Sequence, residues 1–395
     1  MAALFKNNRN LFIIAVIAVV NALGYAIIIP ILYSYSLKFG LNDFQNGLLF
    51  AVFSLFQFLS TPVIGRMSDK FGRRPLLLIS LAGTAISFFM MAFAPSAIFL
   101  FLARALDGIT AGNIPVASAV ISDTTAPQDR AKGFGIIGAS FGFGFIFGPA
   151  ISAFTLHWGS SVPFIIAGVI TLIAIALTAF ILPETNVHMG QVVHGKLFDF
   201  PKLAKSLTDE NVGLTLLVSL IYSFAFGLFI FAYQPVSKKI IGLSDSQIAI
   251  MFTLFGIVGL IAQTLIIPRF TKAVGDRKAL TISLIGLTVT FFSFFLVRSF
   301  MIMAIISIAQ ALANSFVAPL VQALLSKEVD AKSQGSILGI NASYVSLGMI
   351  FGPIICGAVA TILVPLPFLV GSASIAACVL LSVKILRKPH VQHTF

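Results

Sequence analysis

Two stretches of this 395-residue chain, 133–183 and 333–383, contain no Asp, Glu, Lys or Arg. A helix of about 20 apolar residues crosses the hydrocarbon core of a bilayer. Each stretch of 51 residues therefore holds two membrane spans joined by a short turn, at 157–160 in the first and at 365–367 in the second. Both turns fall late in their half of the chain, so the pattern also predicts two similar halves.

The composition indicates the same fold class. Hydrophobic residues make up 58% of the chain, charged residues only 10%, and the mean hydropathy is +1.04, whereas a soluble domain carries about 25% charged residues. We predict an all-α integral membrane protein with twelve transmembrane helices in two pseudo-symmetric six-helix bundles. The spans are expected near 11–33, 44–65, 75–94, 97–122, 133–156, 162–182, 212–234, 247–268, 279–297, 300–325, 334–359 and 366–385.

The distribution of positive charge predicts the orientation. If the loops alternate between two sides, 20 Lys and Arg fall on the side of the N-terminus and 4 on the other, with Arg104 inside a span. The basic side of a membrane protein faces the cytoplasm. We therefore expect a multi-pass protein of the bacterial inner membrane with both termini in the cytoplasm. The net charge of +12 reflects this topology, so we expect no nucleic-acid partner.

A basic loop occurs twice. The loop from Gly65 to Arg74 returns in degraded form 203 residues later, at Pro268 to Arg277. Aligned without a gap, Val63 to Gly83 and Ile266 to Gly286 share nine of 21 residues. Such duplication inside hydrophobic sequence is typical of two-halved membrane transporters. The predicted parts are an N-terminal bundle at 1–183, a cytoplasmic linker at 184–211 and a C-terminal bundle at 212–395.

The first copy of this loop resembles the signature of the major facilitator superfamily, G-x-x-x-D-(K/R)-x-G-R-(R/K). The matching residues are Gly65, Asp69, Lys70, Gly72, Arg73 and Arg74. Glycines permit a tight turn, and the resemblance implies a latch in which the acid and arginines pair with the neighbouring bundle when the cytoplasmic side is closed. A merely basic loop would explain the arginines but not the acid or the two glycines.

Small residues crowd the fifth and eleventh spans. Spacing by four lets helices approach closely, and proline bends a span. The pattern is similar to the antiporter motif of proton-coupled efflux members of the superfamily, G-x-x-x-G-P-x-x-G-G, with Ser152 and Ala153 in place of the closing glycines. The matching residues are Gly144, Gly148 and Pro149 in the fifth span and Gly348, Gly352 and Pro353 in the eleventh. Helix packing alone is the alternative explanation.

Between Ser80 and Pro149 the chain resembles tetracycline efflux pumps and their drug:proton antiporter relatives. The residues that carry this resemblance include Asp107-Gly108-Ile109-Thr110, Asp123-Thr124-Thr125 and Arg130, and we add Asp123 and Arg130 to the candidate gate. Pumps of that group carry acids within helices one, three and nine. This chain departs from that pattern. It has Asn21 in the first helix, Ser87 in the third, and no acid in the ninth, from 279 to 297.

Asp107 is the one acid that the sequence places inside a span, three residues after Arg104. At this spacing both side chains lie on one face of a helix, and ionisable residues within the membrane indicate a functional site. One interpretation is that Asp107 takes up the coupling proton while Arg104 holds its charge or meets an anionic substrate group. The other is a permanent structural ion pair.

Other polar and aromatic residues within the spans are candidates for a substrate cavity. As a set they suit an amphipathic organic molecule better than a sugar. They are Asn21, Tyr25, Gln57, Asn113, Tyr222, Phe226, Gln263, Gln310, Asn314, Asn341 and Tyr344.

We predict a monomeric secondary transporter that exports small drug-like molecules by alternating access, driven by protons. The alternative is a carrier of a specific organic anion or metabolite with Arg104 as charge anchor; a non-transporting receptor would need a soluble ligand-reading domain. We expect no enzymatic activity, because no nucleophile, metal cluster or phosphate loop is recognisable. The expected partners are an organic substrate, protons and the lipid bilayer, with no metal and no cofactor beyond the proton gradient.

Overall fold

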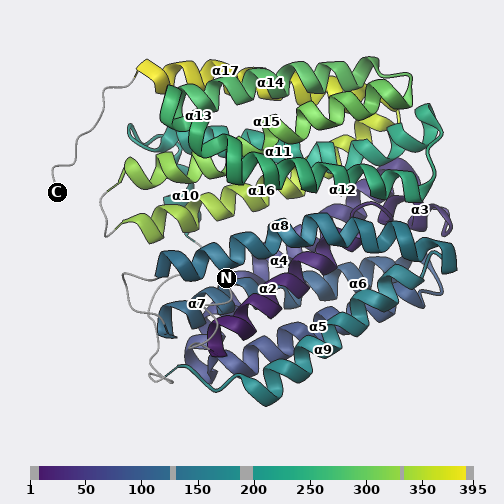
Figure 1. Cartoon of the computed structure of the whole chain (residues 1–395), viewed down its shortest axis with the longest axis vertical. Coiled ribbons are helices and arrows are strands. Elements are labelled where there is room, and N and C mark those ends of the chain that lie inside the picture. The colour runs from purple at the N-terminus through teal and green to yellow at the C-terminus, as the bar shows by residue number, and fades with distance from the viewer. Residues whose placement is uncertain (1–8, 125–129, 187–198, 330–332, 388–395) are drawn as a thin grey trace. The chain divides into compact units, whose positions relative to one another are not determined.

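The computed structural model describes residues 9–124, 130–186, 199–329 and 333–387 (Figure 1). These residues form helices joined by short turns, with no strand among them. Eleven helical segments are long and apolar enough to cross a membrane, and a further apolar helix, Phe12–Ile28, is shorter. The predicted all-α class and its twelve spans are confirmed.

The chain divides into two compact units. The first comprises residues 1–41, 52–198 and 244–253, and the second comprises 42–51, 199–243 and 254–395. The helices of the first unit are α2 (Arg9–Ile28), α3 (Leu32–Leu37), α5 (Arg73–Ala92), α6 (Ala97–Thr110), α7 (Asn113–Thr124), α8 (Arg130–Thr155), the 3-10 turn η2 (Leu156–Trp158) and α9 (Val162–Ile181).

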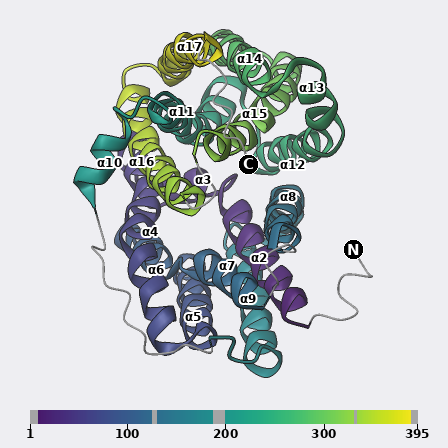
Figure 2. The same ribbon diagram turned by 90° about the vertical axis from the view of Figure 1, so that its left-hand side faces the viewer.

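The second unit repeats this plan (Figure 2). Its helices are α10 (Phe200–Ser206), α11 (Gly213–Val236), the π-helical turns η3 (Ser237–Ile241) and η4 (Ala262–Ile266), α13 (Ile267–Val274), α14 (Asp276–Leu296), α15 (Phe300–Lys327), α16 (Gln334–Ala360) and α17 (Leu366–Arg387). In the first unit α2 packs on α8 and α5 packs on α9; in the second α11 packs on α16 and α14 packs on α17. The two halves of the sequence thus fold in the same way.

Two helices contribute to both units. α4 (Asp43–Phe71) has its first turns in the second unit and the remainder in the first, and α12 (Asp245–Ile261) shows the reverse arrangement. Both begin with a capping box, in which side chain and backbone three residues apart exchange hydrogen bonds. The pairs are Asn42 with Gln45 and Ser244 with Gln247.

Two predicted spans are broken helices. In the first span α2 ends at Ile28 and α3 begins at Leu32, on either side of Pro30, because proline lacks the N–H needed to continue a helix and restricts the preceding residue. In the fourth span α6 ends at Thr110 and α7 begins at Asn113. Pro115 cannot donate to the carbonyl of residue 111, so the break falls one turn after Asp107.

The basic loops are largely helical, which corrects the expectation of a ten-residue loop at 65–74. α4 continues to Phe71, and α13 continues to Val274. Each helix ends at a glycine with positive φ, Gly72 at 101° and Gly275 at 83°, a conformation that favours glycine. The charge-free windows of the sequence mark only the part of a helix that lies in lipid, and α4 and α13 continue beyond that part.

Candidate functional site

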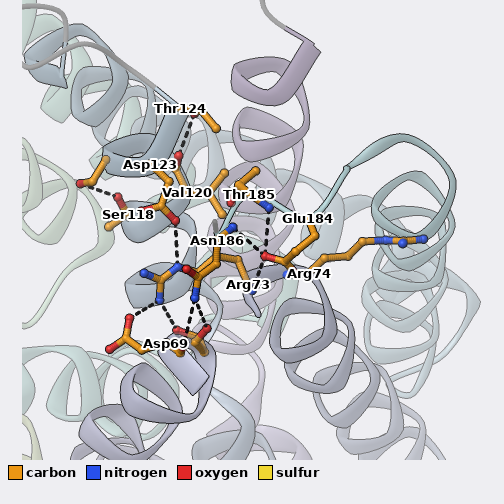
Figure 3. A network of polar contacts seen from close by, with 12 residues as sticks. Asp69, Arg73, Arg74, Ser118, Val120, Asp123, Thr124, Glu184, Thr185 and Asn186 are labelled. Atoms are coloured by element: carbon orange, nitrogen blue, oxygen red, sulfur yellow. Dashed lines mark hydrogen bonds and ion pairs between the residues drawn. The ribbon is translucent and has the colours of Figure 1, made fainter. Parts of the chain in front are cut away.

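Arg73, the first residue of α5, is the centre of a polar network at the α4–α5 turn (Figure 3). Its guanidinium donates to Asp123 on α7 at 2.9 Å, and to Asp69 at 2.5 Å and Ser68 at 2.7 Å on α4. The Arg73 residue is only 9% exposed. The signature arginine therefore joins α4, α5 and α7 within one unit. Pairing of Asp69 with the opposite half stays a prediction.

Glu184, which follows α9, caps the N-terminus of α5. Its two carboxylate oxygens accept from the backbone N–H groups of Arg73 at 2.8 Å and Arg74 at 3.1 Å, which a helix N-terminus leaves without partners. Burial alone would raise the pKa of Glu184, but the N–H groups of Asn186, Arg73, Arg74 and Thr185 donate to the carboxylate and lower its pKa below the usual 4.5.

The neighbouring Asn186 holds the end of α4. Its side-chain amide donates to the backbone carbonyl of Asp69 at 2.8 Å, one of the carbonyls that a helix C-terminus leaves open. Glu184 and Asn186 thus bind both ends of the turn. The sequence analysis placed both residues in the linker, where the available signal was an acid at the membrane edge, two residues after the end of the span predicted at 162–182.

The other predicted gate residues lie around this network. Arg74 donates to the backbone carbonyl of Ala179 on α9, and the Lys70 ammonium lies 5.0 Å from the ring centre of Phe71. A side chain at Gly65 would meet no atom within 4 Å. Arg130 begins α8, and its side chain lies outside the described residues.

The second unit carries an ion pair of inverted polarity at the corresponding place. In the gapless alignment Asp276 occupies the position of Arg73. Asp276 begins α14, and its carboxylate accepts from Lys327 at the end of α15 at 2.5 Å. Each unit therefore ties the first turn of one membrane span to the end of the following span by a salt bridge, with the acid and the base exchanged.

The predicted antiporter motif lies at close helix contacts in both units. A Cβ on Gly144 would approach the Cβ of Ala22 to 2.4 Å, and one on Gly148 the Cβ of Ala26 to 2.7 Å, so α8 lies directly on α2. In the second unit a Cβ on Gly352 would lie 2.4 Å from the Phe224 carbonyl oxygen on α11. Gly348 also meets α11, and Pro149 and Pro353 lie inside their helices.

Arg104 and Asp107 lie together on the buried face of α6, 3% and 6% exposed. Arg104 Nη1 donates to Asp107 Oδ2 at 3.4 Å, a long contact. Gly108, the next residue, allows α4 to approach closely, because a Cβ there would lie 2.5 Å from the Phe53 carbonyl oxygen. The sequence interval of three therefore produces the predicted pair, in a setting closed by α4.

Aromatic side chains surround this pair. The Phe53 ring lies under the Arg104 guanidinium, with 4.4 Å from Cζ to the ring centre. Tyr25 on α2 contacts Phe53 and, edge to face, Phe145 on α8, and it lies close to Arg104. Tyr25 is thus the candidate cavity residue that the structure brings to the pair.

The remaining candidates of the first unit are less closely tied to it. Asn21 lies one turn before Tyr25 on α2 and is half-buried. Gln57 is half-buried on α4, where its backbone N lies next to Gly108. Asn113 begins α7, and its side chain lies outside the described residues.

In the second unit the candidates separate. Tyr222 donates to Asn314 Oδ1 at 2.9 Å and stacks on Phe226. Gln310 is fully buried and accepts from Thr290. The hydroxyl of Tyr344 donates to the Leu203 carbonyl of α10. Asn341 is buried with no partner for its Oδ1 among the described residues, and Gln263 is exposed in η4.

Comparison with known proteins gives the family. The chain matches the Major Facilitator Superfamily twice, over residues 14–214 and 215–395. It is 30% identical over 381 residues to Multidrug resistance protein 1 of Bacillus subtilis (strain 168), covering 96% of each chain. It is 27% identical over 416 residues to Tetracycline resistance protein, class B, of Escherichia coli, covering 98% of each. A solved nucleoside transporter shares the fold, with a TM-score of 0.79 at 15% identity, covering 96% of this chain and 100% of that one.

The two family matches meet between residues 214 and 215, close to the start of α11. They agree with the duplication read from the basic loops and with the repeated packing of the two units. The chain belongs to the Major Facilitator Superfamily and is a multi-pass membrane transporter with the twelve-helix fold of that family.

Proposed function

We propose that the protein exports small, drug-like organic molecules in exchange for protons, by alternating access. Two relatives whose names state resistance to drugs or tetracycline align with at least 96% of the chain, which supports efflux of such molecules. The acids expected in helices one, three and nine of tetracycline pumps are absent from this sequence. The proposal is therefore export of drug-like molecules as a class, with coupling through another acid.

The observation that carries the coupling is the buried pair on α6. A carboxylate and a guanidinium are costly to place within the membrane and usually mark a functional site. This pair is joined by one contact of 3.4 Å. Protonation of Asp107 removes its charge and leaves Arg104 free for another anionic group. The same two side chains therefore have two charge states that a transport cycle can use.

The remaining roles follow from this cycle. We assign the Arg73 network to the cytoplasmic end of the first bundle, where it keeps α4, α5 and α7 together during rocking. Both termini face the cytoplasm, by the charge asymmetry of the loops, in the inner membrane of a bacterium. The monomer is the transporting unit, and the proton gradient is its energy source.

The test is substrate flux in proteoliposomes with and without an imposed pH gradient. Asp107→Asn abolishes accumulation driven by the gradient but still allows substrate binding and passive exchange, whereas Arg104→Lys retains more transport than Arg104→Ala. If Asp107→Asn concentrates substrate as the wild type does, Asp107 is structural and the coupling proposal fails.

A second candidate function is transport of an organic anion or metabolite. Its support is Arg104, whose Nε is buried and has no hydrogen-bond partner among the described residues. An anion carrier would transport organic acids such as benzoate and would not transport cationic dyes. Efflux of a drug without net negative charge, such as ciprofloxacin, driven by the pH gradient, decides for the first candidate.

A further inference from the structure

Arg104 has bonding capacity that the protein does not use. A guanidinium carries five N–H donors, yet in the described part of the chain Arg104 makes one hydrogen bond, from Nη1 to Asp107 at 3.4 Å. One guanidinium face rests on Phe53, and Nε is buried without a partner. An unsatisfied buried donor costs about 1–3 kcal/mol, so the site is built for an acceptor that the chain itself does not supply.

Asp107 is also incompletely satisfied. Its partners among the described residues are Arg104 and the Thr84 hydroxyl on α5, whereas an ionised carboxylate accepts about four hydrogen bonds. The other titratable group near the pair is Tyr25 on α2, and the side chains from α4 and α8 are Phe53 and Phe145. One anion site and one cation site thus lie three residues apart beside aromatic rings.

The charges of this pair restrict the ligand. A purely anionic ligand bound to Arg104 would leave the Asp107 carboxylate without its counter-charge, and a purely cationic ligand at Asp107 would do the same to Arg104. An unpaired charge at a buried site costs several kcal/mol. A molecule that carries both charges replaces both partners at once and leaves neither side chain unpaired.

We propose that Arg104 and Asp107 together form a receptor for zwitterionic aromatic molecules. The anionic group of the substrate binds the Arg104 guanidinium, its cationic group binds the Asp107 carboxylate, and its ring packs against Tyr25, Phe53 and Phe145. This inference rests on the proposed transport function and names its substrate class. It also supplies the exchange, because a proton and the cationic group of the substrate compete for the same carboxylate.

Three forms of one fluorescent scaffold test the proposal without any gradient. Ciprofloxacin is a zwitterion at neutral pH, its methyl ester is a cation, and its N-acetyl derivative is an anion. Binding to the purified protein in nanodiscs is followed by fluorescence anisotropy. The zwitterion binds at least about tenfold more tightly than either derivative, which corresponds to about 1.4 kcal/mol.

The variants move this preference in opposite directions. In Arg104→Gln the zwitterion and the ester bind with equal affinity, because the carboxylate group of the zwitterion then has no partner. In Asp107→Asn the zwitterion and the N-acetyl derivative bind with equal affinity. The double variant Arg104→Gln/Asp107→Asn leaves no unpaired charge behind and so controls for misfolding; it binds all three forms alike. Arg298→Gln, at an exposed arginine of the other unit that donates to the Val297 carbonyl, keeps the wild-type preference.

Two results overturn the proposal: an ester that binds wild type within about twofold of the zwitterion, or an unchanged preference in Arg104→Gln. Failure of all three forms to bind also overturns it. Ciprofloxacin export driven by a pH gradient is measured on the same preparation. If that export is normal while the zwitterion preference is absent, the transport function stands and only the receptor assignment fails.

Discussion

At the α4–α5 turn, single side chains complete the hydrogen bonds of helix ends. Arg73 uses its side chain to join three helices, while its backbone N–H and that of Arg74 bind Glu184. The signature loop is therefore held by a residue 110 or more positions further along the chain. No local pattern shows such a partner, since the acid and the helix that it caps are far apart in sequence.

Removal of this cap destabilises the first unit. Glu184→Ala leaves two N–H groups of α5 without a partner and lowers the free energy of unfolding by about 1 kcal/mol, the usual cost of losing a helix cap. Glu184→Gln retains one acceptor oxygen and costs less. Thermal unfolding of purified protein at pH 7 gives both differences.

The pH dependence follows from the lowered pKa of Glu184. A carboxyl group with a lowered folded-state pKa stabilises the fold above its unfolded value near 4.5, and this contribution is lost as the pH falls through the folded pKa. The difference between wild type and Glu184→Gln therefore shrinks below pH 4.5. A difference that is independent of pH from 7 to 4 would show that the Glu184 charge does not contribute.

At the scale of the helix, a glycine is needed only where a neighbouring helix comes too close to leave room for a side chain. α8 contains Gly144, where a Cβ would overlap Ala22 of α2, and Gly138, where it would meet nothing within 4 Å. α16 repeats the contrast with Gly352 and Gly339. The antiporter-like motif is thus a pair of helix-packing seams, one in each unit, formed by residues without side chains.

Substitution at these seams separates the two kinds of glycine. Gly144→Ala and Gly352→Ala place a methyl group against backbone atoms and cost about 1–3 kcal/mol by overpacking. Gly138→Ala and Gly339→Ala are the matched controls on the same helices and leave stability unchanged or slightly higher. Equal melting temperatures for Gly144→Ala and Gly138→Ala would contradict the packing assignment.

The sequence predicted the long-range plan of these helices better than their details. Charge-free windows are long enough to identify spans, but the break at Pro30 and the break before Pro115 interrupt apolar sequence without adding a charge. Polar residues within spans were ambiguous for a similar reason. Gln310 meets Thr290 inside one bundle and Tyr344 meets α10, because a polar group can be satisfied by a neighbouring helix.

The pair on α6 was predictable because both of its members lie on one element. An interval of three places Arg104 and Asp107 on one helix face whatever the rest of the fold does. Tyr25 and Phe53 reach the pair from α2 and α4, and only the folded unit brings them there. The same holds for Thr84 on α5.

At the scale of the whole molecule, the same helical arrangement occurs in both units, but the two units differ in the charged residues they carry. Both units pack their first and fifth spans together, and both tie a helix start to a helix end by a salt bridge. The buried ion pair lies on α6 of the first unit. If the offset of 203 residues between the two halves is continued, its two positions correspond to Ser307 and Gln310 of α15, which carry no charge. The duplication thus supplies the scaffold, and the departure from it supplies the proposed coupling site.

Substrate-driven proton movement tests this account most directly. Proteoliposomes are loaded with ciprofloxacin and a pH-sensitive dye and diluted into substrate-free buffer of the same pH. In wild-type vesicles, outward flow of the substrate draws protons in and acidifies the lumen. In Asp107→Asn vesicles the substrate equilibrates without acidification. Unchanged luminal pH during substrate efflux through the wild type, or equal acidification through Asp107→Asn, would contradict proton exchange at Asp107.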